Sequence, residues 1–124
     1  MSVDMTLAVE TARVAMGLEE FRAKIAAHNI ATASLPGSQA MQFDASAARN
    51  QLKANTGSDQ LFLQSLRALE HDFNSFLRPQ SSATPLALDA EVAEVSAASG
   101  RYQALADGVS RQFALMQLSI RGGR

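Results

Sequence analysis

Residues Leu88–Ile120 read LDAEVAEVSAASGRYQALADGVSRQFALMQLSI, and mostly apolar positions in this stretch recur at alternating steps of four and three residues. This is the heptad spacing of a helix that packs along one side against another helix. We call these positions the C-terminal seam: Leu88, Val92, Val95, Ser99, Tyr102, Ala106, Val109, Phe113, Met116 and Ile120. At 1.5 Å per residue the predicted helix is about 50 Å long. A helix of this length with one apolar seam requires a partner of comparable length.

The N-terminal part of the chain carries the other long helical pattern. Its positions follow the same steps of four and three: Leu7, Thr11, Val14, Leu18, Phe21, Ile25 and His28. We expect this helix to end near Ser34, because the residue before Pro36 is pushed out of the α region and Gly37 favours a turn. The two helices lie at opposite ends of the sequence, so we expect them to pair antiparallel. The predicted fold class is all-α, with long N- and C-terminal helices paired as an antiparallel coiled coil.

The segment between the two helices is predicted to be a helical and loop excursion within one structural unit. That unit divides into an N-terminal helix over 1–34, a turn, loop and middle helix over 35–87, and a C-terminal helix over 88–124. The length of 124 residues, with 47% hydrophobic and 19% charged residues, fits a single domain with a modest core.

Two helical pieces are predicted inside the excursion. The stretch after the turn, to about Gly57, is interpreted as a loop with a short helical piece around Ala45–Lys53. A longer helix is expected over about 58–78, where Ser58 can cap the first turn. The longer helix has an apolar stripe made by Phe62, Leu66, Leu69, Phe73 and Phe76. The Ser- and Pro-rich stretch PQSSATP then predicts a linker, and the last helix is expected to start at Thr84 or at Asp89.

Composition and charge exclude several classes of protein. A net charge of -1 leaves no basic surplus with which to neutralise a run of phosphates, so we expect no nucleic-acid partner. The absence of cysteine excludes a disulfide framework, a thiolate zinc site and a thiol nucleophile. Asp4 and Glu10 occupy the region where a secretory signal would be basic, and no apolar run approaches membrane-spanning length. We therefore expect neither a cleaved signal peptide nor membrane insertion.

The titratable residues do not form a recognisable catalytic or metal-binding pattern. His28 and His71 each stand without converging ligands in the sequence, so we expect structural or solvated roles for both. The carboxylates near helix starts and on helix faces are interpreted as solvated groups and helix-dipole partners: Glu19, Glu20, Asp89, Glu91 and Glu94. No phosphate-binding loop, nucleophile elbow or zinc-protease motif is present. We expect no enzyme activity, no cofactor and no metal, and an enzyme built around the two histidines is the remote alternative.

Two features of the C-terminal helix indicate further packing partners. Gly100 and Gly108 each cost about 1 kcal/mol relative to Ala at an exposed helical position, so either they are tolerated defects or another helix passes close to them. Leu105, Leu115 and Leu118 lie off the C-terminal seam and make the apolar surface wider than one partner helix covers. This width indicates that additional chains pack around the hairpin.

The C-terminal helix carries two short motifs, Leu-Asp-Ala-Glu-Val at residues 88–92 and Ser-Gly-Arg-Tyr-Gln-Ala-Leu at residues 99–105. They resemble the patterns Leu-Asp-x-Glu-Met and Ser-x-Arg-Tyr-Gln-Ala-Leu in the C-terminal helix of the bacterial flagellar basal-body rod proteins, most nearly the proximal rod proteins. A third motif follows the first helix, where the family has Asn-Ile-Ala-Asn, two variable residues and Thr-Pro-Gly before an aromatic. This sequence matches it at Asn29, Ile30, Ala31, Pro36 and Gly37. It departs from the family pattern at Thr32, Leu35, Ser38 and Ala98.

The resemblance implies a structural subunit of the flagellar rod. Such subunits pass through the flagellar type III export gate without a cleaved signal and assemble helically in the periplasm with other copies and other rod proteins, through their terminal helices. The matched turn residues would shape the turn between packed helices. The residues implied in subunit packing are Leu88, Val92, Val95, Arg101, Tyr102, Gln103, Leu105, Val109, Phe113, Met116 and Ile120.

The family also has a Phe-x-x-x-apolar element after the turn that engages the export gate. Phe43 and Ala47 occupy the corresponding place here, whereas the pairs Phe62 with Leu66 and Phe73 with Leu77 fit the pattern later in the chain. Core packing is the favoured interpretation for these phenylalanines, because any Phe in an amphipathic helix satisfies so loose a pattern.

A soluble helical-bundle adaptor or export chaperone is the alternative function. It would hold other helices in an apolar groove and purify as a compact small oligomer. A rod subunit would instead purify as a partly disordered monomer whose ends become ordered on assembly.

Overall fold

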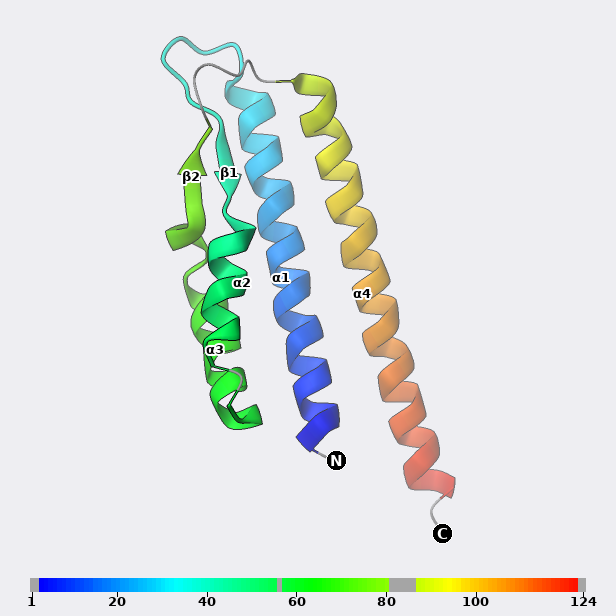
Figure 1. The fold of residues 1–124 in the computed structure, drawn as a ribbon. Coiled ribbons are helices and arrows are strands. Elements are labelled where there is room, and N and C mark those ends of the chain that lie inside the picture. The colour runs from blue at the N-terminus through cyan, green and yellow to red at the C-terminus, as the bar shows by residue number, and fades with distance from the viewer. Residues whose placement is uncertain (1–2, 56, 81–86, 123–124) are drawn as a thin grey trace.

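The computed structural model describes residues 3–55, 57–80 and 87–122. Two long helices dominate it: α1 at Val3–Thr32 and α4 at Leu88–Gly122. They lie side by side and run antiparallel, with the start of α1 and the end of α4 at the same end of the molecule (Figure 1). The predicted all-α fold with paired terminal helices is therefore confirmed. The expected helix start at Thr84 lies outside the described residues, and α4 begins one residue before Asp89.

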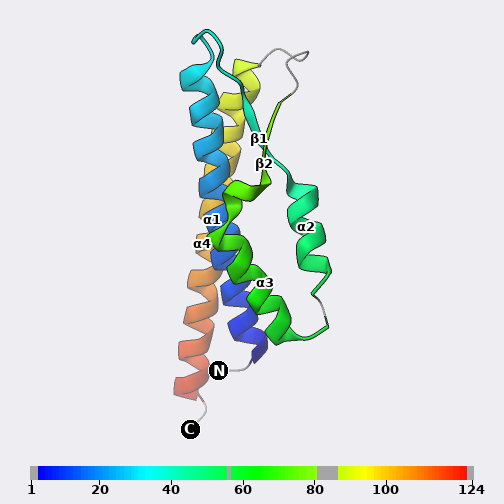
Figure 2. The same ribbon diagram turned by 90° about the vertical axis from the view of Figure 1, so that its left-hand side faces the viewer.

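The middle segment forms a second layer against α1. It contains β1 at Met41–Phe43, α2 at Ala45–Lys53, α3 at Asp59–His71, the 3-10 turn η1 at Phe73–Phe76 and β2 at Leu77–Pro79. These elements lie on the side of α1 away from α4 (Figures 1 and 2). The molecule thus has α1 as its central layer. No helix in the described part of the chain is long and apolar enough to cross a membrane.

Side-chain caps fix the starts of the two middle helices. The Asp44 carboxylate accepts from the Ala47 amide at 3.0 Å, and the Ser58 hydroxyl accepts from the Leu61 amide at 3.1 Å. Each cap satisfies an amide that the first helical turn leaves without a backbone partner. The predicted helix at Ala45–Lys53 and the predicted Ser58 cap are both confirmed.

The predicted extent of the middle helix, to about residue 78, is wrong. The helix ends at His71, because Asp72 leaves the α region at φ -141° and ψ 45°. The chain then tightens into η1, which turns Phe76 into the core, and β2 pairs antiparallel with β1. Phe43 is the register partner of Leu77. Ladder hydrogen bonds and burial of Phe76 thus replace the last two helical turns that the apolar spacing predicted.

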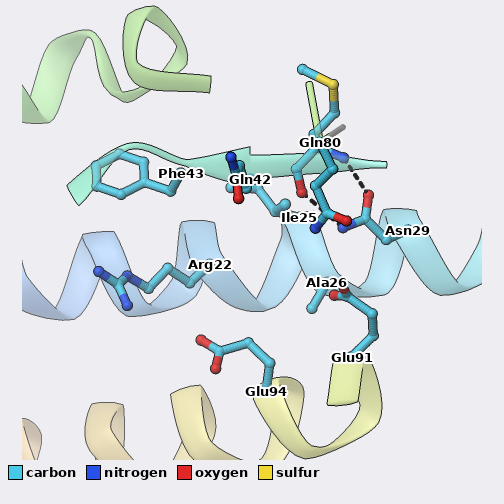
Figure 3. Close-up of a pocket in the computed structure, with 10 residues that line it drawn as sticks. Arg22, Ile25, Ala26, Asn29, Gln42, Phe43, Gln80, Glu91 and Glu94 are labelled. Carbon is cyan, nitrogen blue, oxygen red and sulfur yellow. Dashed lines mark hydrogen bonds between the residues drawn. The ribbon is translucent and has the colours of Figure 1, made fainter. Parts of the chain in front are cut away.

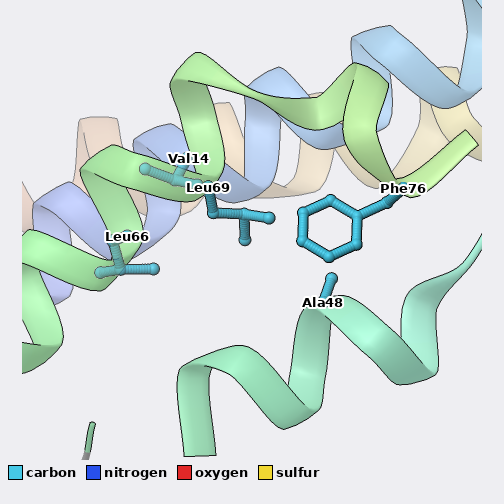
Figure 4. Packing of buried hydrophobic residues seen from close by; sticks show 5 residues of the cluster. All are labelled: Val14, Ala48, Leu66, Leu69 and Phe76. Carbon is cyan, nitrogen blue, oxygen red and sulfur yellow. The ribbon is translucent and has the colours of Figure 1, made fainter. Parts of the chain in front are cut away.

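The main core lies between α1 and the middle segment. Its buried members come from four elements and converge as Figure 4 shows: Val14, Ala48, Leu66, Leu69 and Phe76. Phe76 and three phenylalanines at the edge of this core make ring contacts, with the Phe21 and Phe73 rings stacked at 5.5 Å between centroids. Val14 and Phe21 belong to the apolar pattern of the N-terminal helix. The middle of that pattern therefore faces the middle segment, whereas Leu7 and Thr11 near its start also line a groove with Leu105 of α4.

A different face of α1 packs against α4. Ala26 of α1 and Ala98 of α4 are each 1% exposed. Ala26 lies twelve residues after Val14, which places it about 120° around the helix from the core-facing side. Small residues let two helices approach closely. α1 can thus contact two layers at once, one through large apolar residues and the other through a face that includes buried alanine.

Candidate assembly surface

Most of the exposed large apolar residues in the described part of the chain lie on α4. Seven of its large apolar residues are at least one-third exposed, with fractions from 37% at Tyr102 to 74% at Ile120; the others are Leu88, Val92, Phe113, Leu115 and Leu118. Five of the seven belong to the C-terminal seam. In a folded monomer, large apolar side chains that are exposed in such number along one helix indicate an interaction site.

The C-terminal seam is not centred on the contact between α4 and α1. α1 packs on the flank marked by Ala98 and Leu105, and Leu105 shares an apolar groove with Leu7 of α1 and Phe62 of α3. Of the remaining predicted packing residues, Val95, Val109 and Met116 are half-buried, whereas Gln103 is exposed. The single chain therefore covers one flank of the seam and leaves the other flank open.

Arg101 is bound within its own chain. Its Nε donates to the Glu19 carboxylate of α1, and its Nη2 donates to Glu94 Oε1 at 2.8 Å. The hydrogen bond to Glu19 raises the pKa of the Arg101 guanidinium above its ordinary value. These charges link α1 and α4 beside the buried alanines. The predicted role of Arg101 in subunit packing stays a prediction.

The interpretation of Glu19 as a solvated carboxylate is wrong. Glu19 is 8% exposed, and the guanidinium of Arg101 compensates its burial. Glu19 precedes the buried Ala26 by seven residues, so the two share one face of α1. The seven-residue spacing of Glu19 and Ala26 was the sequence signal that could have indicated this buried face. It indicates burial only when the position of α4 is known.

A pocket of about 240 Å³ lies where α1, β1 and α4 meet (Figure 3). Arg22, Glu91 and Glu94 supply its charged groups, and the Arg22 guanidinium lies 5.6 Å from the centroid of the Phe43 ring. Arg22 Nε is buried and has no hydrogen-bond partner in the described part of the chain. Arg22 forms an ion pair with Glu19, in which Arg22 Nε lies 3.9 Å from Glu19 Oε1. The pocket is therefore lined by charges of both signs.

Asn29 connects the end of α1 to β1. It is 1% exposed, its amide nitrogen donates to the Met41 carbonyl at 2.9 Å, and its Oδ1 accepts from the Met41 amide at 2.9 Å (Figure 3). An Asn side chain presents a donor and an acceptor as a backbone peptide does. The Asn29 side chain therefore makes the pair of hydrogen bonds to Met41 that a residue of an adjacent strand would make. This explains why a polar residue ends the last buried turn of α1.

The predicted turn after α1 is a type II turn. Gly37 has φ 76°, and the Ser38 amide donates to the Leu35 carbonyl at 3.2 Å, with Pro36 between them. The Ser38 hydroxyl also donates to the Thr32 carbonyl at 2.6 Å. Three of the four departures from the family pattern, at Thr32, Leu35 and Ser38, thus take part in closing this turn. Ile30 is half-buried and Ala31 is exposed.

The candidate export-gate residues belong to the core. Phe43 and Ala47 are half-buried and pack against the buried cluster, as do Phe62 and Phe73. Within the folded chain these side chains stabilise the packing of the middle segment on α1. The favoured interpretation of these phenylalanines as core residues is therefore confirmed.

Both histidines lie at the surface of the described part of the chain, since His28 and His71 are both exposed. Within the described residues, no group of three His, Asp or Glu side chains could hold a metal ion. A Cβ added at Gly100 or Gly108 would meet no atom within 4 Å, so no other described element of this chain passes close to either glycine.

Comparison of the chain with protein-family models, with curated proteins and with solved structures finds no match. The functional argument therefore rests on the residues of this chain and on the geometry described above.

Proposed function

We propose that this chain is a structural subunit of the bacterial flagellar basal-body rod, most like a proximal rod subunit. It is exported by the flagellar type III system and assembles helically in the periplasm through its terminal helices. Its partners are other copies of itself, other rod proteins and the export gate. The proposal assigns it no catalytic role, no cofactor and no membrane-spanning segment.

The observation that carries the proposal is the uncovered flank of the C-terminal seam. Leu88, Val92, Phe113 and Ile120 are each 46% exposed or more, although they recur with coiled-coil spacing along a helix of 35 residues. A subunit whose function is to pack against neighbours requires such a surface. The antiparallel pairing of α1 and α4 and the Asn29-to-Gly37 turn also support the proposal, because these are the elements that carry the family resemblance.

The proposed mechanism is mechanical. Burying one large apolar side chain between subunits contributes about 1.5–3 kcal/mol. Several such residues along each α4, repeated in every subunit, would give a stiff assembly. The Glu19 and Arg101 pair would hold α4 at a fixed rotation on α1, so that the seam faces the neighbours in one orientation.

The test begins with deletion of the gene and complementation by a tagged copy. Mass spectrometry of purified hook-basal bodies is expected to detect the tagged chain, and the deletion is expected to abolish swimming. In the complemented strain Tyr102→Asp, on the seam, is expected to prevent incorporation. Ala114→Asp, on an exposed position of the same helix outside the seam, is the matched control and is expected to swim.

A soluble helical-bundle adaptor or export chaperone is the second candidate. An open apolar groove of about 460 Å³ favours it, since such a groove could hold part of another helix; its lining is Leu7, Ala8, Thr11, Ala12, Ala15, Phe62 and Leu105. Absence of the chain from basal bodies together with normal swimming of the deletion strain would contradict the rod proposal. Retention of a bound helix by the purified chain would then favour the adaptor.

A further inference from the structure

The C-terminal seam has a spacing that reads the same from both ends. Its steps of four and three are symmetric about the middle of Leu88–Ile120. A second α4 laid antiparallel along the first would therefore bring seam positions opposite seam positions along the whole helix. The facing pairs, each between one copy and the other, are Leu88 with Ile120, Val92 with Met116, Val95 with Phe113, Ser99 with Val109, and Tyr102 with Ala106.

The sizes of the facing side chains are complementary in this register. The largest seam residues each face a smaller one: Phe113 meets Val95, and Tyr102 meets Ala106. Alternation of large and small residues across an interface fills space without forcing side chains off their rotamers. All of these positions are exposed or half-buried in the single chain, so the second copy has access to them.

The charges beside the seam are also complementary. Asp89 lies in the first turn of α4 and Arg121 in the last. Antiparallel pairing places Arg121 of one copy near Asp89 of the other and opposes the two helix dipoles. In the middle of the interface the flanking positions are neutral, with Ser96 facing Ser110 and Gln103 facing its own copy. No pair of like charges meets across the contact.

We propose that α4 binds a second copy of this chain through the C-terminal seam, as a two-fold antiparallel dimer. This inference goes beyond the rod function and does not rest on it, and it replaces the expectation that a rod subunit purifies as a monomer: the free subunit is expected to be a dimer. In an assembly whose subunits all point the same way, two neighbouring α4 helices cannot be related by the two-fold axis of an antiparallel pair. The dimer is therefore a separate state, which covers the seam and must dissociate before the same surface packs in a rod.

The absence of native cysteine allows a direct test of the register. Full-length Q103C is expected to cross-link to itself with a short bis-maleimide, because the two copies of this position adjoin the two-fold axis. S96C alone and S110C alone are expected not to cross-link, since each lies fourteen residues, about 21 Å, from its own copy along the axis. A mixture of S96C and S110C is expected to give the mixed cross-link. Self-cross-linking of S96C with none in Q103C would overturn the antiparallel register.

The second measurement is the molar mass of the purified chain by light scattering over a range of concentrations. A dimer is expected, with a dissociation constant raised about 100-fold or more in Phe113→Glu, since both copies then bury a carboxylate in the contact. Leu118→Glu is the matched control, because Leu118 lies on the same helix, is 63% exposed and is outside the seam. Circular dichroism checks that both variants fold. A parent chain that is monomeric at every concentration, or equal weakening by both substitutions, would overturn the proposal.

Discussion

Replacing Asn29 by alanine tests whether one side chain joins α1 to β1. The substitution removes two hydrogen bonds of 2.9 Å and leaves the Met41 amide and carbonyl without these partners in a partly buried place. An unsatisfied buried polar group costs about 1–3 kcal/mol, and removing the buried Asn amide offsets part of that cost. We therefore expect Asn29→Ala to lower the free energy of unfolding by about 2–4 kcal/mol. A domain of ordinary stability, about 5–15 kcal/mol, would remain folded.

The assay is urea denaturation of the purified chain followed by circular dichroism, with hydrogen exchange of the Met41 amide as a local probe. Asn50→Ala is the matched control, since Asn50 is exposed in α2, and we expect it to change stability by less than about 0.5 kcal/mol. Asn29→Asp keeps the acceptor but places an oxygen against the Met41 carbonyl, so we expect it to destabilise as much as alanine does. A loss below about 1 kcal/mol in Asn29→Ala, or tolerance of aspartate, would refute the reasoning.

Three further predictions use the same urea assay. Leu69→Ala should lower the free energy of unfolding by about 3 kcal/mol, because Leu69 is 4% exposed within the main core, and a loss under about 1 kcal/mol would contradict that core. Gly108→Ala should raise it by about 1 kcal/mol, since an added Cβ meets open space, whereas a loss would indicate a packing partner at this glycine. The hydrogen bond from Arg13 lowers the pKa of Glu10, so its stabilising effect is present above the unfolded pKa and is lost as the pH falls through the folded value. Glu10→Gln should therefore lose less stability than the parent chain between about pH 5 and about pH 3, and identical pH profiles would count against the ion pair.

The sequence predicted the elements whose signals are local. The helix at Ala45–Lys53, the cap at Ser58 and the extent of α4 depend on spacing, capping and turn residues that lie within a few positions of each other. The antiparallel pairing of α1 and α4 was also predictable, because the chain has just two long helical patterns. For each of these elements, the capping and turn residues and the apolar spacing favour the same structure.

The sequence did not reveal which face of α1 meets which layer. Its strongest apolar pattern, which includes Val14, packs against the middle segment, and α4 uses the face of Ala26 and Glu19. A face with alanine and a carboxylate resembles a solvated face until the compensating Arg101 is placed opposite it. For the same reason β2 was missed, because the helical spacing up to Phe76 continues past the point where pairing with β1 becomes more favourable.

The two kinds of contact made by α4 differ in character, and this couples the folding of the chain to its association. Toward α1, the first half of α4 offers Ala98, Glu94 and Arg101, whereas its open flank carries large apolar residues from Leu88 to Ile120. Whatever covers that flank stabilises the folded state by mass action, by about 2.7 kcal/mol when its concentration is one hundred times its dissociation constant. A two-fold dimer and a one-directional rod would both provide this stabilisation. They differ in polarity, because the dimer places α4 against an antiparallel α4 and closes, whereas the rod requires neighbours that all point the same way and leaves a growing end. The direction of the neighbouring α4, antiparallel or parallel, therefore distinguishes a subunit in the two-fold dimer from a subunit in the rod.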